Sequence, residues 1–143
     1  MPTQDEPAVP VPEWPRWLLR ISLTLAAVLL FTQSITAGLF LGELRAAFPM
    51  HREMATAAAL AVILSIAAAI LCVRLRRDVK WPIAATIGML VLMSLQAFAG
   101  FRSLTALHVP LGVFTITLAA VFAGWAWMRG QQPTVTQPDS NAD

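Results

Sequence analysis

The sequence has few charged residues, one cysteine and two histidines, and each scarcity excludes a class of protein. Of its 143 residues, 57% are apolar and only 13% are charged, a composition far from that of an ordinary soluble domain. The lone Cys72 excludes an intramolecular disulfide and a cysteine-based zinc cluster. The ten Lys and Arg residues are dispersed between apolar runs, which argues against a nucleic-acid partner. A lipid bilayer is the predicted solvent.

Four long apolar runs dominate the chain. Each approaches or exceeds the ~20 residues needed to cross the hydrocarbon core. Backbone groups cannot bond to lipid, so each run is predicted to be a helix. The connections are short, and the predicted fold is therefore all-α, an integral membrane four-helix up-down-up-down bundle over residues 16–128. The predicted helices cover about residues 17–41, 50–73, 81–99 and 104–128.

Both ends of the chain have a different composition. Residues 1–15 hold five prolines and three carboxylates, and residues 129–143 are rich in Gln, Thr, Pro and Asp. Such segments bury too little apolar surface to pack. They are predicted to be a flexible leader and a flexible tail.

Basic and aromatic residues predict the orientation of the bundle. By the positive-inside rule, the side with more Lys and Arg is cytoplasmic, and tryptophan favours the membrane interface. Both termini are thus predicted to be cytoplasmic, in a bacterial inner membrane, and the first run is read as a retained helix because it is too long for a signal peptide. The richer side carries Arg16, Arg20, Arg74, Arg76, Arg77, Lys80 and Arg129, with Trp14, Trp17, Trp81, Trp125 and Trp127; the other side carries Arg45, Arg52 and Arg102.

Carboxylates are missing from the middle of every run. Glu43 and Glu53 lie at the predicted outer end, and Asp78 lies in the basic cytoplasmic loop. A proton-coupled pump or an ion transporter is expected to bury at least one carboxylate. No nucleophile and base occur in a recognisable arrangement either, which disfavours a hydrolase.

The two histidines are the most informative residues. His51 lies about one turn into the second run, after Pro49, and His108 lies one to two turns into the fourth. Those two helices run in the same direction, so at ~1.5 Å per residue the imidazoles should differ in depth by no more than about one helical turn. Two neutral imidazoles at matched depth could supply both axial ligands of a haem iron.

The surrounding residues are compatible with a flat macrocycle. Gly112 and Ala55 each lie four residues after a histidine and share its helix face, so they leave room. Arg45, Arg52 and Arg102 lie near the same outer surface, where guanidinium groups could bond to haem propionates.

A purely structural interpretation stands beside this one. His51 could be an interfacial residue in contact with water, and His108 could bond to the Ala106 carbonyl that Pro110 leaves without a donor. Met89 and Met93 are expected to be core residues. The remaining polar residues within the runs are expected to supply interhelical or i−4 hydrogen bonds, namely Gln33, Ser34, Ser65, Gln96, Thr115 and Thr117.

The pair His51-Arg52 and the segment Leu-His-Val-Pro-Leu-Gly around His108 carry a family resemblance across residues 17–128. The chain resembles one four-helix half of the haem A synthase family, and also small four-helix membrane proteins of actinobacteria that have this segment. The resemblance implies haem b held by His51 and His108. That family has a glutamate where this chain has Phe48, and it has a second half and an outer cysteine pair. Haem A synthesis, and any enzymatic activity of the chain alone, is therefore not predicted.

The sequence thus predicts a cytochrome b-like protein that binds one haem b, for electron transfer, haem handling or redox sensing. Its partners would be the lipid bilayer and a redox protein or larger membrane complex. The alternative is a cofactor-free accessory subunit that packs against a larger membrane complex or a second copy of the chain.

Overall fold

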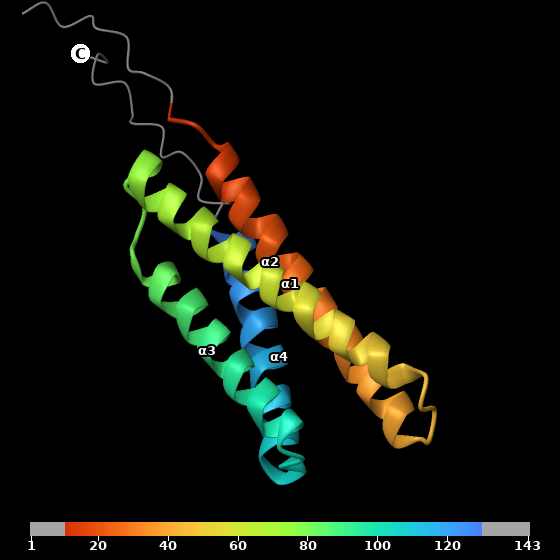
Figure 1. Ribbon diagram of the computed structural model, residues 1–143. Helices are drawn as coiled ribbons and strands as arrows, with labels where there is room; N and C mark the ends of the chain where they lie inside the picture. Colours follow the sequence, from red (N-terminus) through yellow and green to blue (C-terminus); the bar gives the residue numbers. More distant parts are fainter. Residues whose placement is uncertain (1–10, 130–143) are drawn as a thin grey trace, which may run out of the picture.

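The computed structural model describes residues 11–129, which form four helices and no strand (Figure 1). The helices are α1 (Trp14–Leu41), α2 (Ala47–Arg76), α3 (Trp81–Phe101) and α4 (Thr105–Met128). Each is long and apolar enough to cross a membrane. The predicted all-α four-helix membrane bundle is confirmed, and the chain is a multi-pass membrane protein. Most of the predicted leader and tail, residues 1–10 and 130–143, lies outside the described residues.

Three of the helices are longer than the predicted apolar runs, whereas α4 begins at Thr105, one residue later than predicted. Helix α1 begins at Trp14, inside the expected leader, because Pro15 suits a first turn and the amides of Arg16 and Trp17 bond to the Glu13 carbonyl. Helix α2 begins at Ala47 instead of residue 50, which places Pro49 in its first turn. Hydrophobicity locates the part of a helix that crosses the membrane, whereas backbone hydrogen bonds extend the helix beyond it.

The four helices form a ring of neighbours. Close backbone contacts join α1 to α2, α2 to α3, α3 to α4 and α4 to α1, and none joins α2 to α4 or α1 to α3. Helices α2 and α4 therefore occupy opposite corners of the bundle. We call the end with the start of α1 and the end of α4 the basic end, and the opposite end the histidine end. The hairpins α1–α2 and α3–α4 diverge toward the histidine end, where their two loops lie apart (Figure 1).

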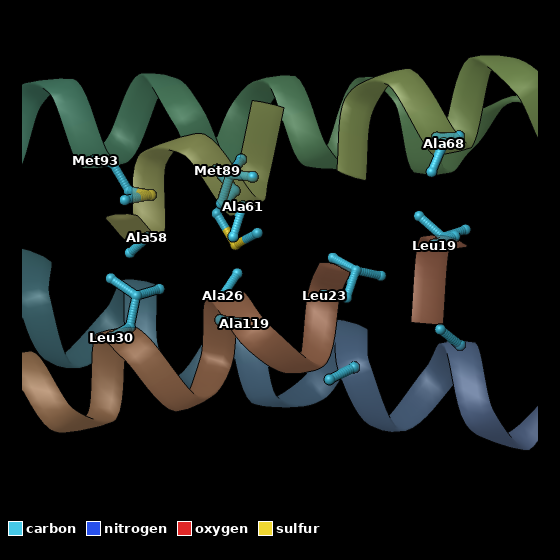
Figure 2. Close-up of a cluster of buried hydrophobic side chains, with 14 of the residues drawn as sticks. Leu19, Leu23, Ala26, Leu30, Ala58, Ala61, Ala68, Met89, Met93 and Ala119 are labelled. Carbon is cyan, nitrogen blue, oxygen red and sulfur yellow. The ribbon is translucent and has the colours of Figure 1, made fainter. Parts of the chain in front are cut away.

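The core is built from a few large side chains set against many small ones (Figure 2). Leu23, Leu30 and Met89 are almost fully buried, and Met93 is 9% exposed. Alanines face them from three helices and allow the backbones to approach closely, as is typical of membrane bundles; among them are Ala26, Ala58, Ala61, Ala68 and Ala119. Both methionines are core residues, as predicted.

Most of the polar residues within the helices make the predicted kinds of hydrogen bond, either between helices or to the carbonyl four residues earlier. Ser65 Oγ on α2 lies 2.9 Å from Ser22 Oγ on α1, a buried contact between helices. Thr115 and Thr117 donate to the carbonyls four residues earlier, at 2.7 and 2.9 Å. Ser34 differs from the prediction, because it donates to the Phe31 carbonyl three residues earlier.

An ion-pair network ties the basic end together. Arg16 on α1 donates two hydrogen bonds to the Asp78 carboxylate in the α2–α3 loop, at 2.9 and 2.7 Å. Arg76 at the end of α2 pairs with Glu13 at 2.9 Å and also donates to the Pro12 carbonyl. The network joins the start of α1 to the connection between the two hairpins.

Candidate functional site

The structure brings the two histidines together across the bundle. His51 comes from the second turn of α2 and His108 from the first turn of α4, and their ring centroids lie 6.2 Å apart with an interplanar angle of 65°. Their helices make no close backbone contact with each other. Only the two side chains make the contact, and each ring is partly buried.

Each imidazole is anchored to the first helix of its own hairpin. His51 Nδ1 lies 3.0 Å from the Gln33 carbonyl oxygen on α1, and His108 Nδ1 lies 2.8 Å from the Gln96 carbonyl oxygen on α3. A carbonyl oxygen only accepts, so both Nδ1 atoms carry the hydrogen. In a neutral imidazole this leaves Nε2 with its lone pair, which is the tautomer that a metal-binding histidine needs.

The anchor of His108 differs from the one that the proline suggested. We considered a bond from His108 to the Ala106 carbonyl, which Pro110 deprives of its helical donor. The ring instead reaches α3 and bonds to Gln96. The bond therefore fixes the imidazole to the neighbouring helix α3 and not to its own helix α4.

Two glycines make space for this arrangement. A Cβ on Gly100 would lie 2.9 Å from His108 Nδ1, and a Cβ on Gly112 would lie 2.8 Å from Gln96 Nε2. Both distances are shorter than real Cβ contacts, so any larger residue would force the His108 ring or the Gln96 side chain to move. Gly112, predicted to leave room for a macrocycle, thus lies against the Gln96 amide.

The separation of the rings suits two ligands on one metal ion. Two metal–nitrogen bonds of about 2 Å, plus roughly 1 Å from each nitrogen to its ring centre, place the centroids of collinear ligands about 6 Å apart. The observed 6.2 Å agrees with this sum. No cluster of three or more His, Cys, Asp or Glu side chains able to hold a metal ion occurs in residues 11–129. A metal ion held by these two rings would need its remaining ligands from a bound group.

The other predicted site residues make no hydrogen bond with either imidazole, whose polar contacts within residues 11–129 are with Gln33 and Gln96. Arg52 is exposed, and its side chain has no hydrogen bond or ion pair to residues 11–129. Arg102 is exposed, with its guanidinium carbon 5.9 Å from the centre of the Phe98 ring. Ala55 is partly buried on α2.

Gln33 and Gln96 are the residues whose role the sequence did not reveal. We expected polar bonds from their side chains, yet it is mainly their backbone carbonyls that hold the histidines. The Gln33 side chain also lies near His51, with the amide nitrogen 3.5 Å from Nε2. One signal was present: each hairpin carries one glutamine in its first helix and one histidine in its second.

Comparisons with family models, with curated proteins and with solved structures yield no match. The resemblance to the haem A synthase family therefore remains a prediction from the sequence.

Proposed function

We propose that the protein binds one haem b through His51 and His108 and serves as a small cytochrome b-like membrane protein. The observation that carries the proposal is the approach of the two imidazoles to 6.2 Å from diagonally opposite helices. The anchoring of both Nδ1 atoms supports it, because this leaves a lone pair on both Nε2 atoms, and a ligand at His51 would replace only the 3.5 Å contact with the Gln33 amide. The interplanar angle of 65° does not oppose it, since two axial imidazoles need not be coplanar to bind one metal ion.

The chain's own contribution would be ligation, orientation and burial. A bound haem iron supplies one-electron chemistry, with a potential tuned by its ligands and surroundings. The Gln33 and Gln96 carbonyls would hold each ring against rotation and raise its basicity as a ligand. The apolar core between the histidines and the basic end would separate the site from the opposite face of the membrane. Electron transfer, haem handling and redox sensing all remain compatible with this arrangement.

We also propose that the basic end faces the cytoplasm of a bacterial cell and that the histidine pair lies near the outer face of the inner membrane. The support is the excess of Arg and Lys at the basic end, together with the tryptophans there. In the structure Trp17, Trp81 and Trp127 are among the exposed apolar residues at this end. Amphipathic rings in such positions favour the level of the lipid headgroups.

The test is the visible absorption spectrum of the detergent-purified protein, oxidised and then reduced with dithionite. We expect the spectrum of a six-coordinate haem b, with one haem per chain. His51→Ala and His108→Ala should each abolish that spectrum. Thr117→Val is the matched control, because Thr117 is exposed and bonds only within α4.

Two results would contradict the proposal. One is a colourless protein from cells supplied with ample haem, even though it is folded. The other is a haem spectrum that persists unchanged in both histidine variants, because the ligands would then lie elsewhere.

The second candidate function is a cofactor-free accessory subunit of a membrane complex. It is supported by open small positions on the outer faces of the bundle: a Cβ added at Gly38, Gly88 or Gly124 would meet nothing within 4 Å. Such positions allow another helix to approach closely. Under this alternative the histidine–carbonyl bonds only join helices, and purification in mild detergent should recover a stoichiometric membrane partner with no haem.

A further inference from the structure

A cavity lies at the basic end of the bundle, away from the histidine pair. It has a volume of about 320 Å³, near the lower limit of ligand pockets, which span ~300 to 1,000 Å³. All four helices line it. Its inner lining is apolar and includes the buried Leu19, Ala69 and Ala126, whereas arginines line it toward the helix ends.

The charges of this cavity are not balanced within the described chain. Three arginines and one aspartate line it, which leaves two positive charges in excess. Arg16 is neutralised by its paired bonds to Asp78. Arg20 and Arg129 have no ion-pair partner among residues 11–129, so their guanidinium groups are available to an anion.

The two available guanidinium groups are held in place. Arg20 Nε donates to the Ala126 carbonyl at 3.0 Å, and its guanidinium carbon lies 5.1 and 5.4 Å from the ring centres of Trp17 and Trp127. Arg129 lies 5.1 Å from the centre of the Trp125 ring. The Nε of Arg20 thus fixes the side chain, and the two terminal nitrogens of its guanidinium group keep their N–H donors for a ligand. A guanidinium presents paired donors that match the oxygens of a phosphate.

The surroundings of the cavity indicate an amphipathic ligand. The chain neighbours of the three lining arginines are exposed and apolar, namely Trp17, Ile21 and Met128. The tryptophans place this level of the bundle at a membrane interface, where phospholipid phosphates are found. A soluble anion would gain nothing from the apolar surface, whereas lipid chains would lie along it.

We propose that this cavity binds the headgroup of an anionic phospholipid, with Arg20 and Arg129 donating to its phosphate. The two excess charges favour a headgroup with net negative charge, such as that of phosphatidylglycerol, over a zwitterionic one. The proposal is independent of haem binding, because the cavity shares no residue with the histidine pair.

The experiment is native mass spectrometry of the full chain, purified and exposed to equimolar phosphatidylglycerol and phosphatidylethanolamine. We expect one retained phosphatidylglycerol. Arg129→Gln should weaken its binding about fivefold, the value for one basic residue at a membrane surface. Arg129→Lys should recover part of the loss, and Arg20→Gln should weaken binding further. Arg74→Gln is the matched control, because Arg74 is exposed at the same end and does not line the cavity.

Arg20→Gln also removes the hydrogen bond to the Ala126 carbonyl. Arg129→Gln is therefore the more direct test, because Arg129 makes no side-chain hydrogen bond or ion pair with residues 11–129. Three outcomes would overturn the proposal. They are equal retention of the two lipids, an equal loss in Arg74→Gln and Arg129→Gln, and displacement of the lipid by glycerol 3-phosphate at equal concentration. The last result would assign the cavity to a soluble phosphate.

Discussion

His51 and His108 lie with ring centroids 6.2 Å apart although their helices make no close backbone contact. Only side chains span the diagonal of the bundle at this point. The carbonyls of Gln33 and Gln96 bond to the Nδ1 atoms of the two rings. Changes that move one ring without removing it are therefore the most informative tests of the site.

Gly100→Ala should displace the His108 ring while leaving the bundle folded. The added Cβ would lie 2.9 Å from Nδ1, and a side chain yields more easily than a backbone. We expect the bond to Gln96 to lengthen or break, with little loss of stability. The ¹⁵N NMR signals of the His108 ring in haem-free protein report this change. Gly124→Ala is the control: nothing lies near the new Cβ, the ring signals should not move, and α4 should gain about 0.5 to 1 kcal/mol. Unchanged His108 signals in Gly100→Ala would show that the ring does not lie against α3.

Ser22 and Ser65 should be energetically coupled. Their hydroxyl oxygens lie 2.9 Å apart between α1 and α2, both fully buried. Ser22→Ala, Ser65→Ala and the double variant form a thermodynamic cycle whose interaction energy should be about 0.5 kcal/mol, the usual value for membrane helices. Unfolding in SDS titrations measures it. Ser94→Ala, which removes an exposed bond within α3, should show no coupling to Ser65→Ala.

Asp78→Asn should loosen the basic end. The substitution removes the carboxylate that receives two bonds from Arg16 and leaves the side-chain shape nearly unchanged. The two side chains are 22% and 38% exposed, so the loss should be about 1 kcal/mol of unfolding free energy and should shrink at high salt. Glu53→Gln, an exposed carboxylate with no ion pair to residues 11–129, should change stability by less than half as much. An equal loss at low and high salt would argue that packing, not charge, is responsible.

The orientation can be read with single cysteines in a Cys72→Ala background. Leu44→Cys lies in the loop between α1 and α2, and Val79→Cys lies between α2 and α3; both side chains are exposed. A membrane-impermeant maleimide added to intact spheroplasts should label position 44 and spare position 79, because the basic loop is expected to be cytoplasmic. Lysed cells should label both. The reverse pattern in intact spheroplasts would invert the proposed topology.

The sequence predicted the fold well because the bilayer leaves few choices. Apolar length alone located four helices, and short connections made them antiparallel. The rise per residue predicted that His51 and His108 differ in depth by about one turn at most, and the ring centroids lie 6.2 Å apart in the structure. The helix ends at Trp14 and Ala47 could not be read in this way, because they depend on backbone hydrogen bonds outside the apolar runs.

The surroundings of the histidines were harder to predict. The residue type does not show that a glutamine will bond to a histidine through its backbone carbonyl, because any residue at position 33 or 96 offers the same carbonyl. The need for Gly100 arises only from the closeness of α3 and α4. Which helices form the diagonal is likewise a property of the assembled ring and not of any one segment.

Each hairpin holds its histidine with its own carbonyl and needs nothing from the other half to do so. The hairpins share one core, yet the short connection between Arg76 and Trp81 is the only covalent link between them. Two copies of the chain that exchanged hairpins would rebuild the same imidazole pair twice. A spectrum of the site would then be identical in the monomer and in the exchanged dimer, and molecular mass alone would tell them apart.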